Sequence, residues 1–130
     1  MADDPVTRAR ALLGAPFRLH GRGTDGIDCI GLIAAAFEED AIPTGYALRT
    51  ATLAPLLDAL VARGFVASEL ASGALVALRP GPAQLHLGIW TGVSLIHADA
   101  GIGRVVETPG RPANILGIWQ PKGDSWQRSS

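Results

Sequence analysis

The sequence has one cysteine, Cys29, and three histidines, the residue types of thiol nucleophiles and of general bases near neutral pH. A single cysteine excludes an intramolecular disulfide and the paired-cysteine motifs of zinc and redox sites. Cys29 directly follows Asp28, a typical N-cap residue, so we expect the thiol in the first turn of a helix. Backbone N–H groups and the helix dipole at that end favour a thiolate and lower the pKa of a thiol. Cys29 is therefore either a nucleophile or a small buried apolar residue, the common fate of a lone cysteine.

Two of the histidines stand in neighbouring β-prone runs in the second half of the chain. His86 begins one run and His97 ends the next, with the turn residues Thr91 and Gly92 between them. Such a turn predicts antiparallel pairing, which would bring both imidazoles close together on one face of a sheet. Neighbouring imidazoles could then act as a general base and its orienting partner. The alternative is two histidines with unrelated hydrogen-bond partners.

A zinc site is a second chemical interpretation of the same residues. Cys29, His86, His97 and Asp99 all carry side chains that can bind zinc. They are scattered along the chain, however, and none of them forms a CxxC, HxxxH or HExxH pair. We therefore expect no metal and no organic cofactor.

The glycines Gly21, Gly23 and Gly26 spell GxGxxG ahead of the predicted cysteine helix. In a dinucleotide-binding protein this motif follows a strand and opens a helix inside a βαβ unit. Here a helix and a loop containing a proline precede it, and hairpins fill the second half of the chain. A flexible loop beside Cys29 is the favoured interpretation.

The elements that must position these residues change in type near Gly64. Before it, the sequence predicts three helices: from the Asp4 cap and Pro5 to Gly14, from Cys29 to about Asp40, and over Thr52–Arg63. The second is apolar nearly all round, which is typical of a buried helix. After Gly64 the chain has short β-prone runs: Phe65–Ala67, Leu75–Leu78, Leu87–Trp90, Ser94–His97, Arg104–Glu107 and Ile115–Trp119. Helices followed by strands indicate the α+β class.

Composition excludes several classes of function. The chain has 130 residues, 48% of them hydrophobic and 18% charged, which suits one folded domain over residues 1–121 with a polar tail over 122–130. A net charge of −1 excludes the basic surface of a nucleic-acid binder. No apolar run approaches the ~18 residues of a membrane-spanning helix, and the acidic start is not a secretory signal. We expect synthesis in the cytoplasm and delivery by a partner.

Four blocks of the sequence resemble the NlpC family of cell-wall cysteine peptidases in order and spacing. The blocks are Leu13–Arg18, Gly26–Leu32, His86–Trp90 and Ile96–Ala98, which are similar to LG-x-PYRWGG, G-x-DCSGL, HVGIY and IHA in the family pattern. The similarity extends over most of the chain, from Ala11 to Trp119. An aliphatic residue after the cysteine, here Ile30, is most similar to the small members encoded in tail modules of phages and gene transfer agents.

The resemblance implies a papain-like α+β fold in which the nucleophile helix packs on a C-terminal antiparallel sheet. It implies hydrolysis of peptidoglycan stem peptides, commonly between D-γ-glutamyl and the diamino acid. By position, Cys29 corresponds to the nucleophile, His86 to the general base and His97 to the orienting residue. Asp28 and Phe17 correspond to substrate-binding positions. The resemblance also implies phage-tail-like partners and action in the periplasm or at the cell wall.

Three positions depart from the family pattern. Phe17 replaces a tyrosine whose hydroxyl lies by the nucleophile, Ile30 replaces a serine, and Ala74 replaces the aspartate of GDLV. Loss of one oxyanion donor can lower a rate by ~10²–10³. Two other hypotheses therefore stay open: a tail-tip or hub component with little activity, and a transferase or thioesterase that uses the Cys–His pair on an acyl group.

Overall fold

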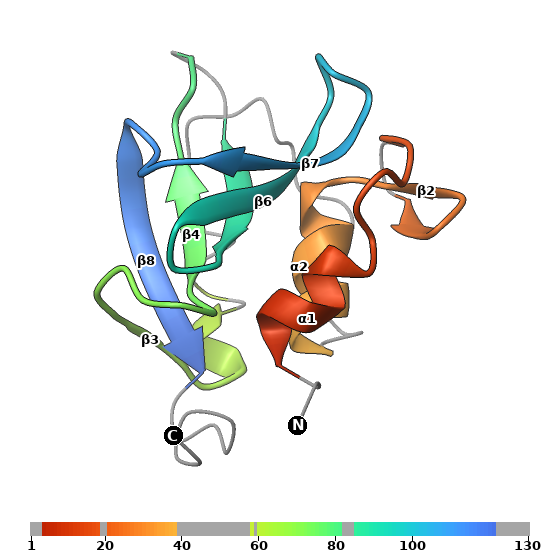
Figure 1. The fold of residues 1–130 in the computed structure, drawn as a ribbon. Helices are drawn as coiled ribbons and strands as arrows, with labels where there is room; N and C mark the ends of the chain where they lie inside the picture. Colours follow the sequence, from red (N-terminus) through yellow and green to blue (C-terminus); the bar gives the residue numbers. More distant parts are fainter. Residues whose placement is uncertain (1–3, 19–20, 39–57, 59, 82–84, 122–130) are drawn as a thin grey trace.

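A six-stranded antiparallel sheet and two helices form the described part of the protein, which confirms the α+β class (Figure 1). The computed structural model describes residues 4–18, 21–38, 58, 60–81 and 85–121. Along the sheet the strands follow the order β3-β8-β4-β5-β6-β7, and a separate two-stranded sheet pairs β1 with β2. The elements are α1 (Pro5–Arg10), β1 (Arg22–Gly23), β2 (Gly26–Ile27), α2 (Cys29–Phe37), β3 (Phe65–Ala67), β4 (Leu75–Leu78), β5 (His86–Trp90), β6 (Ser94–Asp99), β7 (Arg104–Pro109) and β8 (Ile115–Pro121).

All six predicted β-prone runs are strands, and the helices begin where the sequence predicts. Both helices end earlier than expected. α2 ends at Phe37 because Glu38 adopts a left-handed conformation with φ of 57°. The loop expected between the first two helices contains the short hairpin β1–β2. Of the third predicted helix, residues 58 and 60–62 are helical, and the rest of it and the tail over 122–130 lie outside the described residues.

Helix α2 is central because nearly all its side chains are apolar and buried. It packs with α1 against one face of the sheet (Figure 1). The side chains that make up this core come from both layers, and the largest of those that are fully buried are Ile27, Ile30, Leu32, Ile33, Leu60, Leu75, Leu87, Ile89 and Ile96. Full burial of each such side chain contributes roughly 1.5–3 kcal/mol. This core therefore holds the first residue of α2 firmly against the sheet.

Helix α1 joins α2 to the edge of the sheet. The Asp4 carboxylate caps α1 by accepting from the Thr7 N–H at 2.7 Å. From within the helix, Arg8 Nε donates to the Ala36 carbonyl at 2.7 Å, near the end of α2. Arg10 forms an ion pair of 2.9 Å with Glu107 on the edge strand β7.

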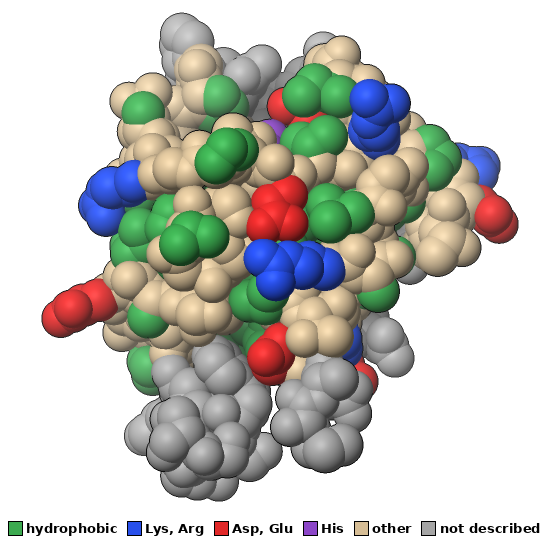
Figure 2. Space-filling view, viewed as in Figure 1, with side chains coloured by type: hydrophobic (Ala, Val, Ile, Leu, Met, Phe, Trp, Pro, Cys, Tyr) green, Lys and Arg blue, Asp and Glu red, His purple; other side chains and the backbone are tan. Residues whose placement is uncertain are grey.

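A smaller apolar cluster lies on the other face of the sheet. It consists of Val76, Leu78, Trp90 and Leu95, which alternate along their strands with the residues of the main core. On the face shown in Figure 2, acidic and basic side chains are interspersed with apolar ones. Within the described residues, no helix is long and apolar enough to cross a membrane.

Candidate active site

Cys29 is the first residue of α2, as the sequence predicts. Asp28 precedes it as the N-cap, and its Oδ1 accepts from the Gly31 N–H at 2.8 Å. The thiol is 1% exposed and lies against the backbone N–H of Leu87 in β5, with the N–H groups of Cys29 and Ile30 also acting on it. Backbone donors from two elements therefore surround the sulfur.

The protonation state of Cys29 differs from the sequence-based expectation. A helix N-terminus predicts a lowered thiol pKa, but burial raises the pKa of Cys29 to about 12. The nearby negative charge of Asp28 raises the pKa further, while the N–H groups of Leu87, Cys29 and Ile30 lower it by a smaller amount. The expectation of a preformed thiolate is wrong for this structure because the cost of desolvating the anion exceeds the stabilisation by the helix end. The resting sulfur carries its proton.

The two histidines meet on one face of the sheet. Strand β5 pairs with β6 so that Gly88 stands opposite His97, and His86 Nε2 lies 2.8 Å from His97 Nδ1. The ring planes are nearly perpendicular, at 89° with centroids 4.9 Å apart. A Cβ on Gly88 would lie 2.9 Å from the side chain of Leu95, so this position must stay small. The predicted proximity of the imidazoles is confirmed, and the catalytic roles stay a prediction.

Both imidazoles are neutral near neutral pH. Burial lowers the pKa of His86 to about 4, and the neighbouring His97 lowers it further, against the opposing charge of Asp99. Burial also lowers the pKa of His97, again against Asp99. Because His86 Nε2 is taken by His97, its Nδ1 is the nitrogen that can exchange a proton with a reacting group. His86 directly precedes Leu87, whose N–H contacts the thiol.

Sequence reasoning missed Thr108, which completes a chain of three polar side chains. Its Oγ1 lies 2.9 Å from His97 Nε2. The strand predicted to end at Glu107 continues to Pro109, which brings Thr108 into the sheet. In the β6–β7 register, Thr108 stands opposite Leu95, two residues before His97 and on the same face. A predicted strand that ended one residue later, at Thr108, would have included this side chain.

Phe17 and Asp28 are the two predicted substrate-binding residues: Asp28 directly precedes Cys29, and Phe17 pairs with Ile27. Phe17 forms an isolated bridge with Ile27, and its side chain packs, partly buried, against the main core. Asp28 is 2% exposed and caps α2. The helix cap is the role that the structure shows for Asp28, and contact of either residue with a substrate stays a prediction.

The glycines of the GxGxxG sequence belong to the β1–β2 hairpin and not to a βαβ unit. Gly21 is pressed against the opposite arm of this hairpin, because a Cβ at this position would lie 2.2 Å from the carbonyl oxygen of Gly26. The Gly21 carbonyl in turn accepts from the Asp28 N–H at 3.3 Å. The close approach of these backbones helps to hold Asp28, the residue before Cys29. It also explains why position 21 needs glycine, and no bound nucleotide is required for that explanation.

The Gly21→Ala variant is expected to lose about 1–3 kcal/mol of unfolding free energy, the range for overpacking. The added methyl group would push the hairpin arms apart and disturb the Asp28 cap. Gly23→Ala is the matched control, because nothing lies within 4 Å of a Cβ there. Urea unfolding of both variants gives the comparison. Equal stability of the two would contradict the steric role of Gly21.

The zinc interpretation finds no support in the geometry. Among the residues that the structure describes, no group of three or more His, Cys, Asp or Glu side chains could hold a metal ion. Asp99 lies at the end of β6 with its Oδ1 accepting from the Ile102 N–H at 3.0 Å, and its Oδ2 is 4.0 Å from His97 Nδ1.

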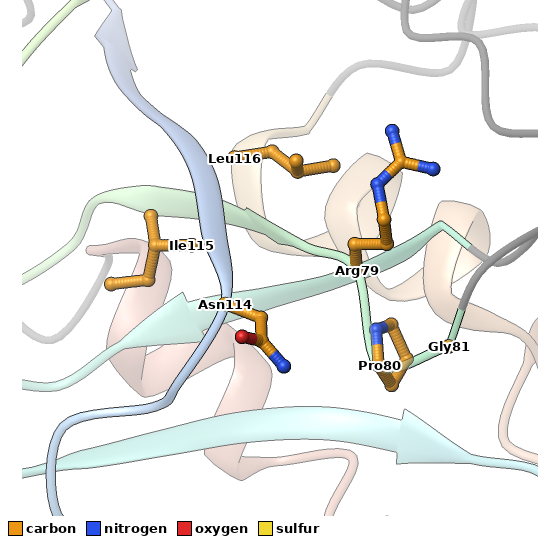
Figure 3. A pocket seen from close by; sticks show the side chains of 6 residues that line it. All are labelled: Arg79, Pro80, Gly81, Asn114, Ile115 and Leu116. Atoms are coloured by element: carbon orange, nitrogen blue, oxygen red, sulfur yellow. The ribbon is translucent and has the colours of Figure 1, made fainter.

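A shallow hollow of about 450 Å³ lies where β4 ends and β8 begins (Figure 3). Its lining residues are Arg79, Pro80, Gly81, Asn114, Ile115 and Leu116. The Arg79 N–H donates to the Asn114 carbonyl at 3.0 Å, which links the two strands beneath it. None of the predicted site residues lines the hollow, although Leu78, next to Arg79, pairs with His86.

A papain-like α+β domain is the class that this fold defines, and solved structures share it. No protein-family model and no curated protein matches the sequence. The NlpC/p60 domain of the peptidoglycan hydrolase SagA is similar with a TM-score of 0.62 and 17% identity, over 92% of this chain and 98% of that one. The P60 domain of antigen MAP1204 from M. avium subspecies paratuberculosis gives 0.61 and 20%, over 92% and 93%. The peptidoglycan hydrolase RipB from Mycobacterium tuberculosis gives 0.59 and 25%, over 92% and 63%. The fold is that of NlpC/P60 domains, as the sequence blocks implied.

Proposed function

We propose that this protein is a cysteine peptidase that hydrolyses peptide bonds in peptidoglycan stem peptides. The observation that carries the proposal is the hydrogen bond of 2.8 Å between His86 Nε2 and His97 Nδ1. His86 belongs to β5, the strand whose Leu87 N–H contacts the Cys29 thiol. Two of the similar structures are described as peptidoglycan hydrolases or their domains. The four sequence blocks that resemble the NlpC family contain these same three side chains.

The mechanism follows from the protonation states. Neutral His86 accepts the Cys29 proton at Nδ1 while the sulfur attacks the carbonyl carbon of the stem-peptide amide. Backbone N–H groups at the start of α2 stabilise the oxyanion. The His86 imidazolium then protonates the leaving amine, which breaks the peptide bond and leaves a thioester on Cys29. His86 next takes a proton from a water that attacks the thioester carbon and returns that proton to the leaving sulfur, so hydrolysis releases the carboxylic acid and restores the thiol. His97 holds the His86 ring throughout.

The substrate bond that we propose joins D-γ-glutamyl to the diamino acid of the stem. This part of the proposal rests on the resemblance to the NlpC family. Within it, Asp28 and Phe17 contact the substrate, Asp28 through the free amine of the stem peptide. Ile30 after the nucleophile supports a place among tail proteins of phages or gene transfer agents, with action in the periplasm or at the cell wall.

Mass spectrometry of digested peptidoglycan tests the reaction directly. Purified protein is expected to release new amino groups from the stem peptides, and the masses of the fragments identify the bond that is cut. A protein carrying Cys29→Ala should give the same pattern as buffer. Identical digests from the wild type and this variant would contradict the proposal.

A second candidate is a tail-tip or hub component with the same fold and little activity. The observation that favours it is the resting state of Cys29, whose thiol is 1% exposed with its pKa raised to about 12. The apolar residues Phe17, Ile30 and Ala74 also favour this candidate, because each replaces a polar group of the family pattern. For such a component, the wild type and Cys29→Ala would assemble equally into tails and neither would cleave peptidoglycan.

A further inference from the structure

Thr108 ends a chain of three polar groups that begins at the proposed general base. The chain runs from His86 Nε2 to His97 Nδ1 at 2.8 Å, and from His97 Nε2 to Thr108 Oγ1 at 2.9 Å. His97 is 9% exposed, so its ring nitrogens depend on protein partners. Thr108 itself lies at the surface on edge strand β7.

Two arrangements of protons fit these distances, and they differ in what His86 can do. If His97 carries its proton on Nδ1, it donates to His86 Nε2, and neutral His86 then holds its proton on Nδ1 and cannot accept another there. If His97 carries its proton on Nε2, His97 Nδ1 accepts from the His86 Nε2–H. His86 Nδ1 is then a free lone pair. The second arrangement alone makes His86 a base at Nδ1.

The second arrangement needs an acceptor for the His97 Nε2–H. A buried imidazole N–H without a partner is costly, and the hydroxyl oxygen of Thr108 is in place to accept it. The same hydroxyl can donate to the Nε2 lone pair in the first arrangement, so Thr108 decides whether the second arrangement has a partner for its N–H. Asp99 faces the other ring nitrogen of His97, but its Oδ2 is 4.0 Å away and its Oδ1 accepts from the Ile102 N–H. Thr108 therefore makes the shorter contact with His97, and it makes that contact at Nε2.

We propose that the Thr108 hydroxyl is a positioning group that accepts from the Nε2–H of His97 and so sustains the tautomer that leaves Nδ1 of His86 free to act as the base. This inference rests on the proposed peptidase function for its kinetic consequence. The part that concerns the tautomer is a property of the folded protein and does not depend on any substrate.

Nitrogen-15 NMR of the imidazoles near neutral pH tests the tautomer. In the wild type, His97 is expected with its proton on Nε2 and His86 with its proton on the same ring position. Thr108→Val keeps the shape of the side chain and removes the acceptor, so the His97 proton should move to Nδ1. Thr108→Ser keeps the hydroxyl and should retain the wild-type spectrum. A wild-type His97 protonated on Nδ1, or a Val variant with an unchanged spectrum, would overturn the inference.

Kinetics on peptidoglycan fragments supply a second measurement. Thr108→Val is expected to lower kcat about ten- to a hundredfold with KM unchanged, by analogy with the range for hydrogen-bond partners of metal-binding histidines, and Thr108→Ser should restore most of the rate. If the wild type cleaves peptidoglycan and Thr108→Val does so at the same rate, the inference fails while the proposed function stands. If the wild type does not cleave but the spectra change as expected, the proposed function fails and the tautomer selection stands.

Discussion

The Cys29→Ser variant is expected to lose about four orders of magnitude or more in kcat/KM for peptidoglycan hydrolysis. The proposed mechanism requires neutral His86 to remove the proton of the nucleophile as the bond forms. A serine hydroxyl is far less acidic than a thiol and a poorer nucleophile, and His86 is a weak base because burial lowers its pKa to about 4. Progress curves with a defined stem-peptide fragment, at high concentrations of the variant, measure the loss.

Serine also controls for structure at this position. It differs from cysteine by one atom, so the tight site beside the Leu87 N–H can accommodate it. The thermal unfolding temperature of the variant should stay close to that of the wild type. Retention of a tenth of the activity or more in Cys29→Ser would rule out Cys29 as the nucleophile, whereas no cleavage by either protein would favour the hub hypothesis.

Mild acid is expected to destabilise the protein through His86, by about 3 kcal/mol between pH 6.5 and pH 4. Burial lowers the pKa of His86 from 6.5 to about 4 in the folded protein. In this window the unfolded chain binds a proton on His86 that the folded protein does not. Stability therefore falls as the pH falls from 6.5 to 4. Urea unfolding at both ends of the window measures the change.

The variant His86→Gln isolates this contribution. Glutamine stays neutral, so the variant should lose about 3 kcal/mol less than the wild type over the same window. Other groups also weaken the fold in acid: Glu107, whose pKa is lowered first by its hydrogen bond to Arg10, and His97, whose pKa is lowered by burial. Both remain in the variant, so the difference between the two proteins reports on His86. Equal losses would mean that the pKa of His86 is the same in the folded and the unfolded protein.

The positions of the strands could be predicted because their boundaries are local. Gly64, with φ of 82°, directly precedes β3, and Gly73, with φ of 91°, lies two residues before β4. Gly92 adopts φ of 110° in the turn between β5 and β6. Glycine is the residue that enters this conformation without strain. The start of α2 is also local, because the Asp28 carboxylate caps a helix that begins with the next residue. A turn residue and a cap need no distant partner to be recognised.

Hydrogen-bond partners across strands were predicted where a short turn sets the register. His86 and His97 lie on strands joined by the turn at Thr91 and Gly92, so the pairing of their imidazoles follows from the order of residues. Thr108 belongs to the next strand, and its partner depends on how far β7 extends past Glu107. The hairpin β1–β2 was missed for a related reason, since its strands have two residues each and no periodicity to read.

The sequence by itself determined the α+β class, the helix that begins at Cys29 and the strands that carry the two histidines. Tertiary structure decided the chemistry of these residues in the resting protein. A helix N-terminus favours a thiolate, yet packing α2 on β5 leaves the sulfur 1% exposed and raises its pKa to about 12. Burial likewise keeps His86 neutral, and β7 supplies the hydroxyl that meets His97. The physical reason is that desolvation depends on every atom packed around a group, whereas a cap or a turn depends on its neighbours in the chain.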